Sequence, residues 1–156
     1  MMNLQRRRRG FSLIELLIVI AIILIIITIA LPKFSSAQKY AKEVAALGAI
    51  RTIHTMEVQY MSQYGKYATA LTELGPPTSG APSPSAADLI DGTLAAGEKG
   101  GYKFTLSANS GGYIINAAPT AYGVTGTRTF YSDQSMIVRQ NFGQEPATAN
   151  SPELKN

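Results

Sequence analysis

The chain contains no cysteine among its 156 residues, and His54 is its single histidine. Without cysteine it can form no disulfide and no cysteine-ligated zinc site, and it has no thiol nucleophile. Any folded domain must therefore be stabilised by packing alone. GxSxG, P-loop and HExxH motifs are also missing from the sequence, so no hydrolase, nucleotide-binding or metalloprotease chemistry is indicated. We predict a protein that is not an enzyme, with no cofactor and no metal site, and we expect His54 to be a packing or surface residue.

Basic charge is scarce outside one short segment, although the formal net charge is +4. Four of the fourteen basic residues are consecutive, and residues 10–156 carry ten basic and ten acidic side chains. The consecutive residues are Arg6, Arg7, Arg8 and Arg9. The positive charge therefore belongs to a short leader, and the neutral remainder gives no strong sign of nucleic-acid binding.

A long apolar run follows the leader. Residues 11–31 contain one charged side chain, Glu15. As a helix at 1.5 Å per residue this run is about 30 Å long, the thickness of a bilayer core. The arginines flank one end only, which predicts a cytoplasmic N-terminus and an external location for everything after Pro32. A charge at membrane depth costs at least ~2.5–3.5 kcal/mol, so we expect a partner for the Glu15 carboxylate.

The pattern becomes amphipathic beyond Pro32, where apolar residues recur at spacings of three and four. They are Phe34, Ala37, Tyr40, Val44, Leu47, Ile50, Ile53, Met56, Tyr60 and Tyr64. We predict one helix from Phe11 to about Tyr64, kinked at Pro32 and stopped by Gly65. The first half of this helix has nothing in its own chain to pack against, so it needs lipid or copies of itself.

Strand-like patterns dominate the rest of the chain. Residues 75–88 form a loop rich in proline, glycine and serine, and a short helix is expected within 87–96 with Asp88 near its start. Two hairpins are predicted from strands at 101–108 and 112–119, and at 127–133 and 135–141. The fold class is thus α+β, a long N-terminal helix packed on a four-stranded antiparallel sheet. The predicted parts are a leader (1–10), a transmembrane or filament-core helix (11–32), an amphipathic helix (33–64), a globular domain (65–143) and a flexible C-terminal tail (144–156).

The sequence RRRRGFSLIELLIVIAIILIIITIALP, residues 6–32, resembles the class III signal of type IV pilins and type II secretion pseudopilins. The resemblance rests on the basic leader, on Gly10 and Phe11 at the cleavage point, on Glu15 at the fifth mature position and on Pro32 at the twenty-second. It implies a pilin fold and cleavage between Gly10 and Phe11 by a prepilin peptidase. It also implies N-methylation of Phe11.

The resemblance further implies that the protein is first a membrane protein and then a filament subunit. Mature subunits would wait in the inner membrane, spanning it once with a cytoplasmic N-terminus. An assembly platform with minor pilins would then build a homo-oligomeric helical filament, as a cell-surface pilus or a periplasmic pseudopilus. Glu15 would pair with a Phe11 amine, its own or a neighbour's, and so penalise subunits out of register. Relatives often carry glycine in mid-segment, but residues 22–27 here read IILIII. We therefore expect any unwinding to stay within Thr28–Pro32.

Several alternatives stay open from sequence. A type IV pilus would serve adhesion, twitching motility or DNA uptake, and a type II secretion pseudopilus would push substrates outward. The lack of an acidic calcium loop argues against the major pseudopilin, and the lack of cysteine against the pilin branch that closes a disulfide loop. A signal-anchored or secreted periplasmic protein, cut at the small residues 35–37, is a remote alternative. A membrane-anchored enzyme lacks a convergent polar site. A DNA receptor would need a basic patch from Lys99, Lys103, Arg128 and Arg139.

Overall fold

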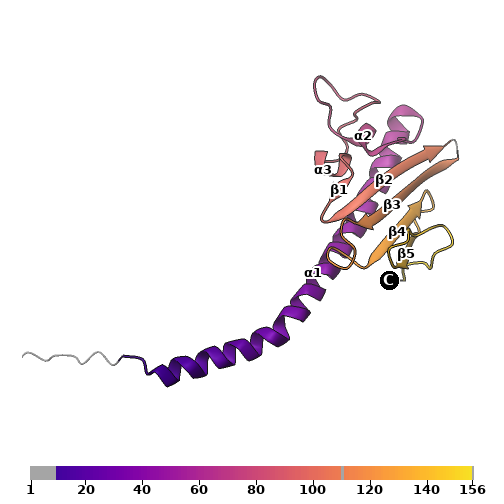
Figure 1. Cartoon of the computed structure of the whole chain (residues 1–156). Helices are drawn as coiled ribbons and strands as arrows, with labels where there is room; N and C mark the ends of the chain where they lie inside the picture. Colours follow the sequence, from indigo (N-terminus) through magenta and orange to yellow (C-terminus); the bar gives the residue numbers. More distant parts are fainter. Residues whose placement is uncertain (1–9, 110, 156) are drawn as a thin grey trace, which may run out of the picture. The chain divides into compact units, whose positions relative to one another are not determined.

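The structure is a computed structural model, and it describes residues 10–109 and 111–155. The four arginines of the leader, Arg6, Arg7, Arg8 and Arg9, lie outside the described residues. The chain divides into two compact units, Met1–Ala37 and Gln38–Asn156, which are described separately below. Helix α1, Leu13–Tyr64, contributes residues to both units (Figure 1).

In the first unit, α1 is a single rod of apolar side chains. Leu13 is 78% exposed and Leu31 is 61% exposed, and the large apolar residues between them are exposed as well. Pro32 lies inside the helix without ending it. Two hydroxyls near it donate to carbonyl oxygens of the preceding turn, Thr28 Oγ1 to Ile25 at 2.7 Å and Ser36 Oγ to Pro32 at 3.1 Å. The helix is therefore continuous through Pro32, and a kink there stays a prediction.

The second unit is a head domain in which the C-terminal half of α1 packs on one face of an antiparallel sheet. The five strands follow one another in chain order across this sheet (Figure 1). They are β1 (Glu98–Lys99), β2 (Tyr102–Asn109), β3 (Gly112–Pro119), β4 (Arg128–Asp133) and β5 (Val138–Phe142). Both predicted hairpins are confirmed, β2 with β3 and β4 with β5. Fully buried Ile50 and Ile53 of α1 share the core with Ile115 and Phe130 of the sheet.

The sheet has five strands, so the predicted number of four is wrong. The added strand β1 is two residues long and pairs with the start of β2, Glu98 opposite Lys103 and Lys99 opposite Tyr102. Its turn consists of Gly100 and Gly101, with φ of 62° and 83°. Two consecutive residues with positive φ match the twist of a two-residue hairpin, and the Gly-Gly pair was the sequence signal for it.

Two short helices interrupt the connection between α1 and the sheet, α2 (Leu71–Leu74) and α3 (Gly92–Ala95). The expected helix near Asp88 starts later, because Asp91 is its N-cap and accepts from the backbone N–H groups of Thr93 and Leu94. Asp88 instead has a φ of 55°. Hydrogen bonds from Lys99 and Thr93 hold the pKa of Asp91 well below its usual range, so this cap stays ionised.

The buried face of α1 differs from the predicted apolar stripe. Tyr40 is 64% exposed and Val44 is 47% exposed, although both belong to the stripe. Three polar residues are buried in their place: Glu43, His54 and Glu57. The stripe failed here because hydrogen-bonding partners on other elements, which spacing along α1 cannot reveal, make these polar positions tolerable.

The segment after β5, which composition predicts to be flexible, makes several contacts with the sheet. Its backbone pairs with the free edge of β5, where Gln140 N donates to Pro152 O at 2.9 Å and Leu154 N to Val138 O at 2.8 Å. Ala147 is 2% exposed. The tail therefore covers an edge that would otherwise present unpaired backbone groups to other strands.

We predict that Gly101→Ala lowers the free energy of unfolding by about 1–3 kcal/mol, because an L side chain at this φ is strained. The added Cβ would also lie 3.1 Å from the Cβ of Thr125. Gly48→Ala is the control, since Gly48 is helical with nothing within 4 Å of an added Cβ. Helix propensity predicts a gain of up to about 1 kcal/mol for that variant. Urea unfolding of the full chain in detergent micelles measures the free energy of unfolding of both variants. Equal changes in the two variants would contradict a turn at Gly100 and Gly101 that requires positive φ.

Candidate functional site

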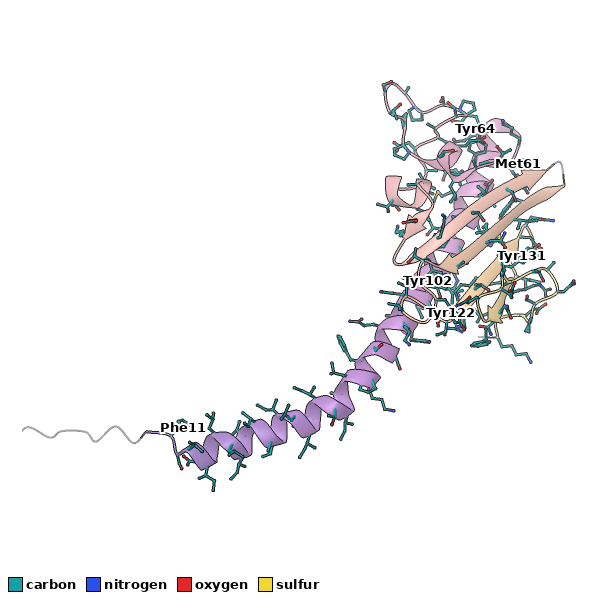
Figure 2. The ribbon with its side chains drawn as sticks, in the orientation of Figure 1. Phe11, Met61, Tyr64, Tyr102, Tyr122 and Tyr131 are labelled. Atoms are coloured by element: carbon teal, nitrogen blue, oxygen red, sulfur yellow. The ribbon has the colours of Figure 1, made fainter. Side chains whose placement is uncertain are left out.

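The predicted cleavage point lies in chain that has no regular structure. Gly10 and Phe11 precede the first residue of α1, and both are exposed. The Phe11 ring is 88% exposed and stands near the start of the described chain (Figure 2). A protease needs an accessible peptide bond outside a helix, and the Gly10–Phe11 bond meets this requirement.

Glu15 has a local partner that the sequence analysis missed. Its Oε2 accepts a hydrogen bond from the backbone N–H of Ser12 at 2.8 Å. Helix α1 begins at Leu13, so Glu15 reaches back to the residue before the first turn. The signal was present in the sequence, since Ser12-Leu13-Ile14-Glu15 has the S-x-x-E spacing of a capping box. The carboxylate therefore lies at the positive end of the helix dipole. It is bonded to the backbone N–H of Ser12, and the nitrogen of Phe11 belongs to the preceding residue.

The first unit is able to cross a membrane. By length and composition α1 is the one candidate span among the described residues, and its most apolar window is not buried at all. Figure 2 shows side chains on every side of this part of the rod. Because the described chain covers none of this apolar surface, lipid or other copies of the rod must cover it.

A buried ion pair joins α1 to the sheet within the head domain. Glu43, 4% exposed, accepts from Arg128 Nε at 2.8 Å and Nη2 at 2.7 Å, and from the backbone N–H of Thr127 at 2.8 Å. Burial alone would raise the pKa of Glu43, but the hydrogen bonds from Thr127 and Arg128 outweigh it and lower the pKa. The Arg128 guanidinium also lies 5.7 Å from the ring centroids of Phe130 and Phe142. This pair therefore fixes the helix against β4 by charge as well as by shape.

His54 forms a second polar connection between α1 and the sheet. Its Nδ1 lies 2.6 Å from the Tyr113 hydroxyl, and its Nε2 lies 2.8 Å from Ser132 Oγ. Ser132 Oγ donates to the Ile137 carbonyl, so it accepts from the imidazole N–H, and Nδ1 accepts from Tyr113. Burial lowers the pKa of His54, although Asp133 opposes this effect. A neutral ring with both nitrogens satisfied is a packing residue, as predicted, and not a free ligand.

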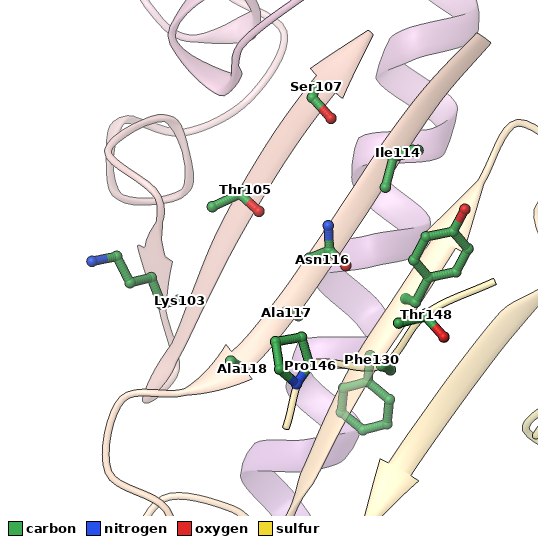
Figure 3. Close-up of a pocket in the computed structure, with 12 residues that line it drawn as sticks. Lys103, Thr105, Ser107, Ile114, Asn116, Ala117, Ala118, Phe130, Pro146 and Thr148 are labelled. Carbon is green, nitrogen blue, oxygen red and sulfur yellow. The ribbon is translucent and has the colours of Figure 1, made fainter. Parts of the chain in front are cut away.

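A shallow groove of about 540 Å³ runs along the sheet beside the C-terminal tail (Figure 3). Its polar lining comes from Lys103, Thr105 and Ser107 of β2, Asn116 of β3 and Thr148 of the tail. The described lining includes one cation and no carboxylate. It therefore holds no acid–base pair, and no group of His, Asp or Glu among the described residues is able to hold a metal ion.

Comparisons with known proteins identify the family of the chain. Residues 5–31 match the family described as the prokaryotic N-terminal methylation motif. The type IV wide pilus major component PilA4 of Thermus thermophilus is 31% identical over 124 residues, which cover 75% of this chain and 95% of that protein. The chain belongs to the type IV pilin family.

A second relative of this pilin is the type IV major pilin protein PilA of Myxococcus xanthus. It is 38% identical over 69 residues, which cover 44% of this chain and 31% of that protein. The match thus spans about a third of the Myxococcus pilin. No solved structure matches the chain at a significant level. Type IV pilins are structural proteins, and the family implies processing at the N-terminal motif and assembly into pili.

Most of the four cations that a DNA receptor would need are paired in this pilin. Lys99 pairs with Asp91 at 2.6 Å, Arg128 with Glu43 at 2.7 Å and Arg139 with Glu153 at 3.1 Å. Of the four residues considered, Lys103 alone has no ion-pair partner among the described residues. These four residues therefore offer little of the positive charge that non-specific DNA binding requires.

We predict that Glu43→Gln lowers the free energy of unfolding of the pilin by about 2–3 kcal/mol at pH 7, because Arg128, whose side chain is 14% exposed, loses its charged partner and keeps the neutral Gln140. Glu153→Gln, which breaks the more exposed pair with Arg139, should cost about 1 kcal/mol or less. A pKa lowered in the folded state stabilises above the unfolded value and is lost as the pH falls. Glu43→Gln should therefore also flatten the acid limb of stability below about pH 4.5. Urea unfolding across pH measures both effects, and equal losses in the two variants would contradict this role.

Proposed function

We propose that the chain is a structural subunit of a type IV pilus, cut after Gly10 and assembled into a filament through the first half of α1. The observation that carries the proposal is an apolar rod without cover from its own chain, joined in sequence to a folded head. The Thermus relative supports it, since that protein is the major component of a pilus and is matched over 95% of its length.

The leader supplies orientation and a cleavage signal in this proposal. The four arginines keep the N-terminus in the cytoplasm, and Gly10 gives a prepilin peptidase an unhindered backbone at the cut. Cleavage converts the Phe11 nitrogen into a cationic amine, which is then methylated. The cleaved subunit stays in the inner membrane as a single span until an assembly platform with minor pilins extracts it.

Glu15 has two successive partners in this scheme. Before cleavage it caps the Ser12 N–H at 2.8 Å. After cleavage the new amine at Phe11 stands one residue before this cap, so the carboxylate gains a charged partner without moving far. In the filament the amine of Phe11, its own or a neighbour's, neutralises Glu15 among apolar helices. Because an unpaired charge there is costly, the pair selects register more than it adds net stability.

A pilus is favoured over a type II secretion pseudopilus. Both curated relatives carry pilus names, and the described residues contain no acidic cluster suited to calcium. Adhesion and twitching motility are the uses we propose for the filament. DNA uptake by direct binding receives less support, since three of the four candidate cations are paired within the head.

The processing step gives a direct test. We predict that fibres sheared from cells have this chain as their main component, with a mature N-terminus at Phe11 that carries one added methyl group. Electron microscopy and mass spectrometry of the same fibres measure both. Surface fibres of cellular length support a pilus, and short periplasmic material supports a pseudopilus. A mature start at Gln38 would instead indicate an ordinary secretory signal and would overturn the proposal.

Glu15 variants separate its two roles. We predict that Glu15→Val and Glu15→Gln both leave cleavage at Gly10 intact and both reduce filament yield, because neither retains the charge. Glu15→Gln keeps an acceptor for the Ser12 N–H and so controls for loss of the helix cap. Quantitative immunoblots of sheared fibres against whole cells give the yield. Normal piliation with either variant would contradict charge pairing, and normal piliation with Glu15→Gln alone would assign the role to the cap.

A further inference from the structure

Glu57 is the one described side chain with a fully buried polar atom that lacks a hydrogen-bond partner. Its residue exposure is 0%, and Oε1 has no partner among the described residues. Oε2 accepts a single hydrogen bond, from the backbone N–H of Ala68 at 3.0 Å. A carboxylate with one donor and no cation is among the most costly groups to bury. Neither the fold nor the proposed pilus function accounts for it.

The hydrogen bond from Ala68 crosses the end of α1. Helix α1 ends at Tyr64, and Gly65 follows with a φ of 72°. Ala68 is itself 0% exposed, so Glu57 pins a buried residue three positions beyond this glycine. One turn further along α1, the Tyr60 hydroxyl donates to the Pro84 carbonyl at 2.6 Å. The end of α1 thus contacts the segment before α2 through Glu57, and it contacts the loop after α2 through Tyr60. Of these two contacts, only the one at Glu57 involves a group that titrates near neutral pH.

Among the described ionisable groups that act on Glu57, none is a cation. Lys66, within residues 65–70, acts on Glu73 instead. From α2, Glu73 acts on Glu57 by repulsion. Burial opposes ionisation of Glu73, but hydrogen bonds from the side chain and backbone of Thr69 lower its pKa and keep it charged. From α1 and β3 come Tyr60 and Tyr113, and burial raises the pKa of each to about 12, so both stay neutral. Ionised Glu57 would therefore meet a negative charge and two neutral hydroxyl groups.

We propose that Glu57 is a proton-operated latch, which holds residues 65–70 against α1 while its carboxyl group is protonated and releases them when it ionises. The protonated group is neutral and still accepts from Ala68, so the closed arrangement is tolerable. The ionised group has one hydrogen bond and faces Glu73, and opening at Gly65 lets water reach it. The latch would thus couple the pH outside the cell to the order of the segment between α1 and α2.

The direction of the effect follows from linkage. Burial, together with Glu73, raises the pKa of Glu57 to about 7 in the closed state, from its usual 4.5. The closed form therefore binds the proton more tightly than the open form. Its advantage is complete below the usual value and is lost as the pH rises toward 7, with little further change above that. Between pH 5.5 and 8 the opening constant should rise about 30-fold.

Amide hydrogen exchange of the full chain in detergent micelles tests the latch. We expect the protection of the Ala68 amide, normalised for the intrinsic exchange rate, to fall about 30-fold between pH 5.5 and 8. The amide of Ile115, which is 0% exposed and pairs with Ser132 in the middle of the sheet, is the reference and should keep its protection. Glu57→Gln should make Ala68 protection independent of pH. Glu98→Gln, which changes an exposed carboxylate, should retain the profile of the unchanged chain.

Three results would overturn the proposal. The first is constant Ala68 protection in the unchanged chain. The second is the same pH dependence in Glu57→Gln. The third is parallel loss of protection at Ala68 and Ile115, which would mean global unfolding. If Glu57→Gln does not fold, the comparison of Ala68 with Ile115 in the unchanged chain and in Glu98→Gln still decides.

Discussion

Helix α1 must satisfy two different surroundings within one continuous helix of 52 residues. Its first half presents apolar side chains in all directions, and its second half buries one face against the sheet of the head. A helix that is apolar all round is stable only in lipid or among other helices, whereas a one-sided helix is stable against its own domain. The sheet, the connecting segment and the tail all serve the second half alone.

Three carboxylates on α1 meet the cost of burial in three ways. Glu15 begins as a helix cap and, in the proposed filament, ends beside a terminal amine. Glu43 is neutralised by Arg128 and two further donors from Thr127. Glu57 has no cationic partner and one hydrogen-bond donor, so protonation is what removes the cost of its buried charge. Glu43 and Glu57 therefore respond to pH in opposite directions: acid weakens the first contact and strengthens the second.

Much of this arrangement could be predicted from the sequence, because it depends on local patterns. The long helix, its end at Gly65 and both hairpins follow from periodicity and turn residues. Strand β1 was missed because two residues are too few to show a periodic pattern. The pair Gly100-Gly101 did indicate a turn at this place. The burial of Glu43 and Glu57 was out of reach, since their partners lie 85 and 11 residues further along the chain. Long-range pairing of single polar residues leaves no trace in spacing.

The composition of the rod also limits where the information for assembly can lie. Residues 22–27 are isoleucine and leucine alone, and such side chains pack against one another at several rotations and shifts with similar energy. They supply contact area but select no register, since lipid tails are as apolar as these side chains. Glu15 is the one charged side chain in residues 11–31. In the proposed filament, alignment of neighbouring rods must therefore be decided at the N-terminal turn, and the rest of the rod follows from that single pairing.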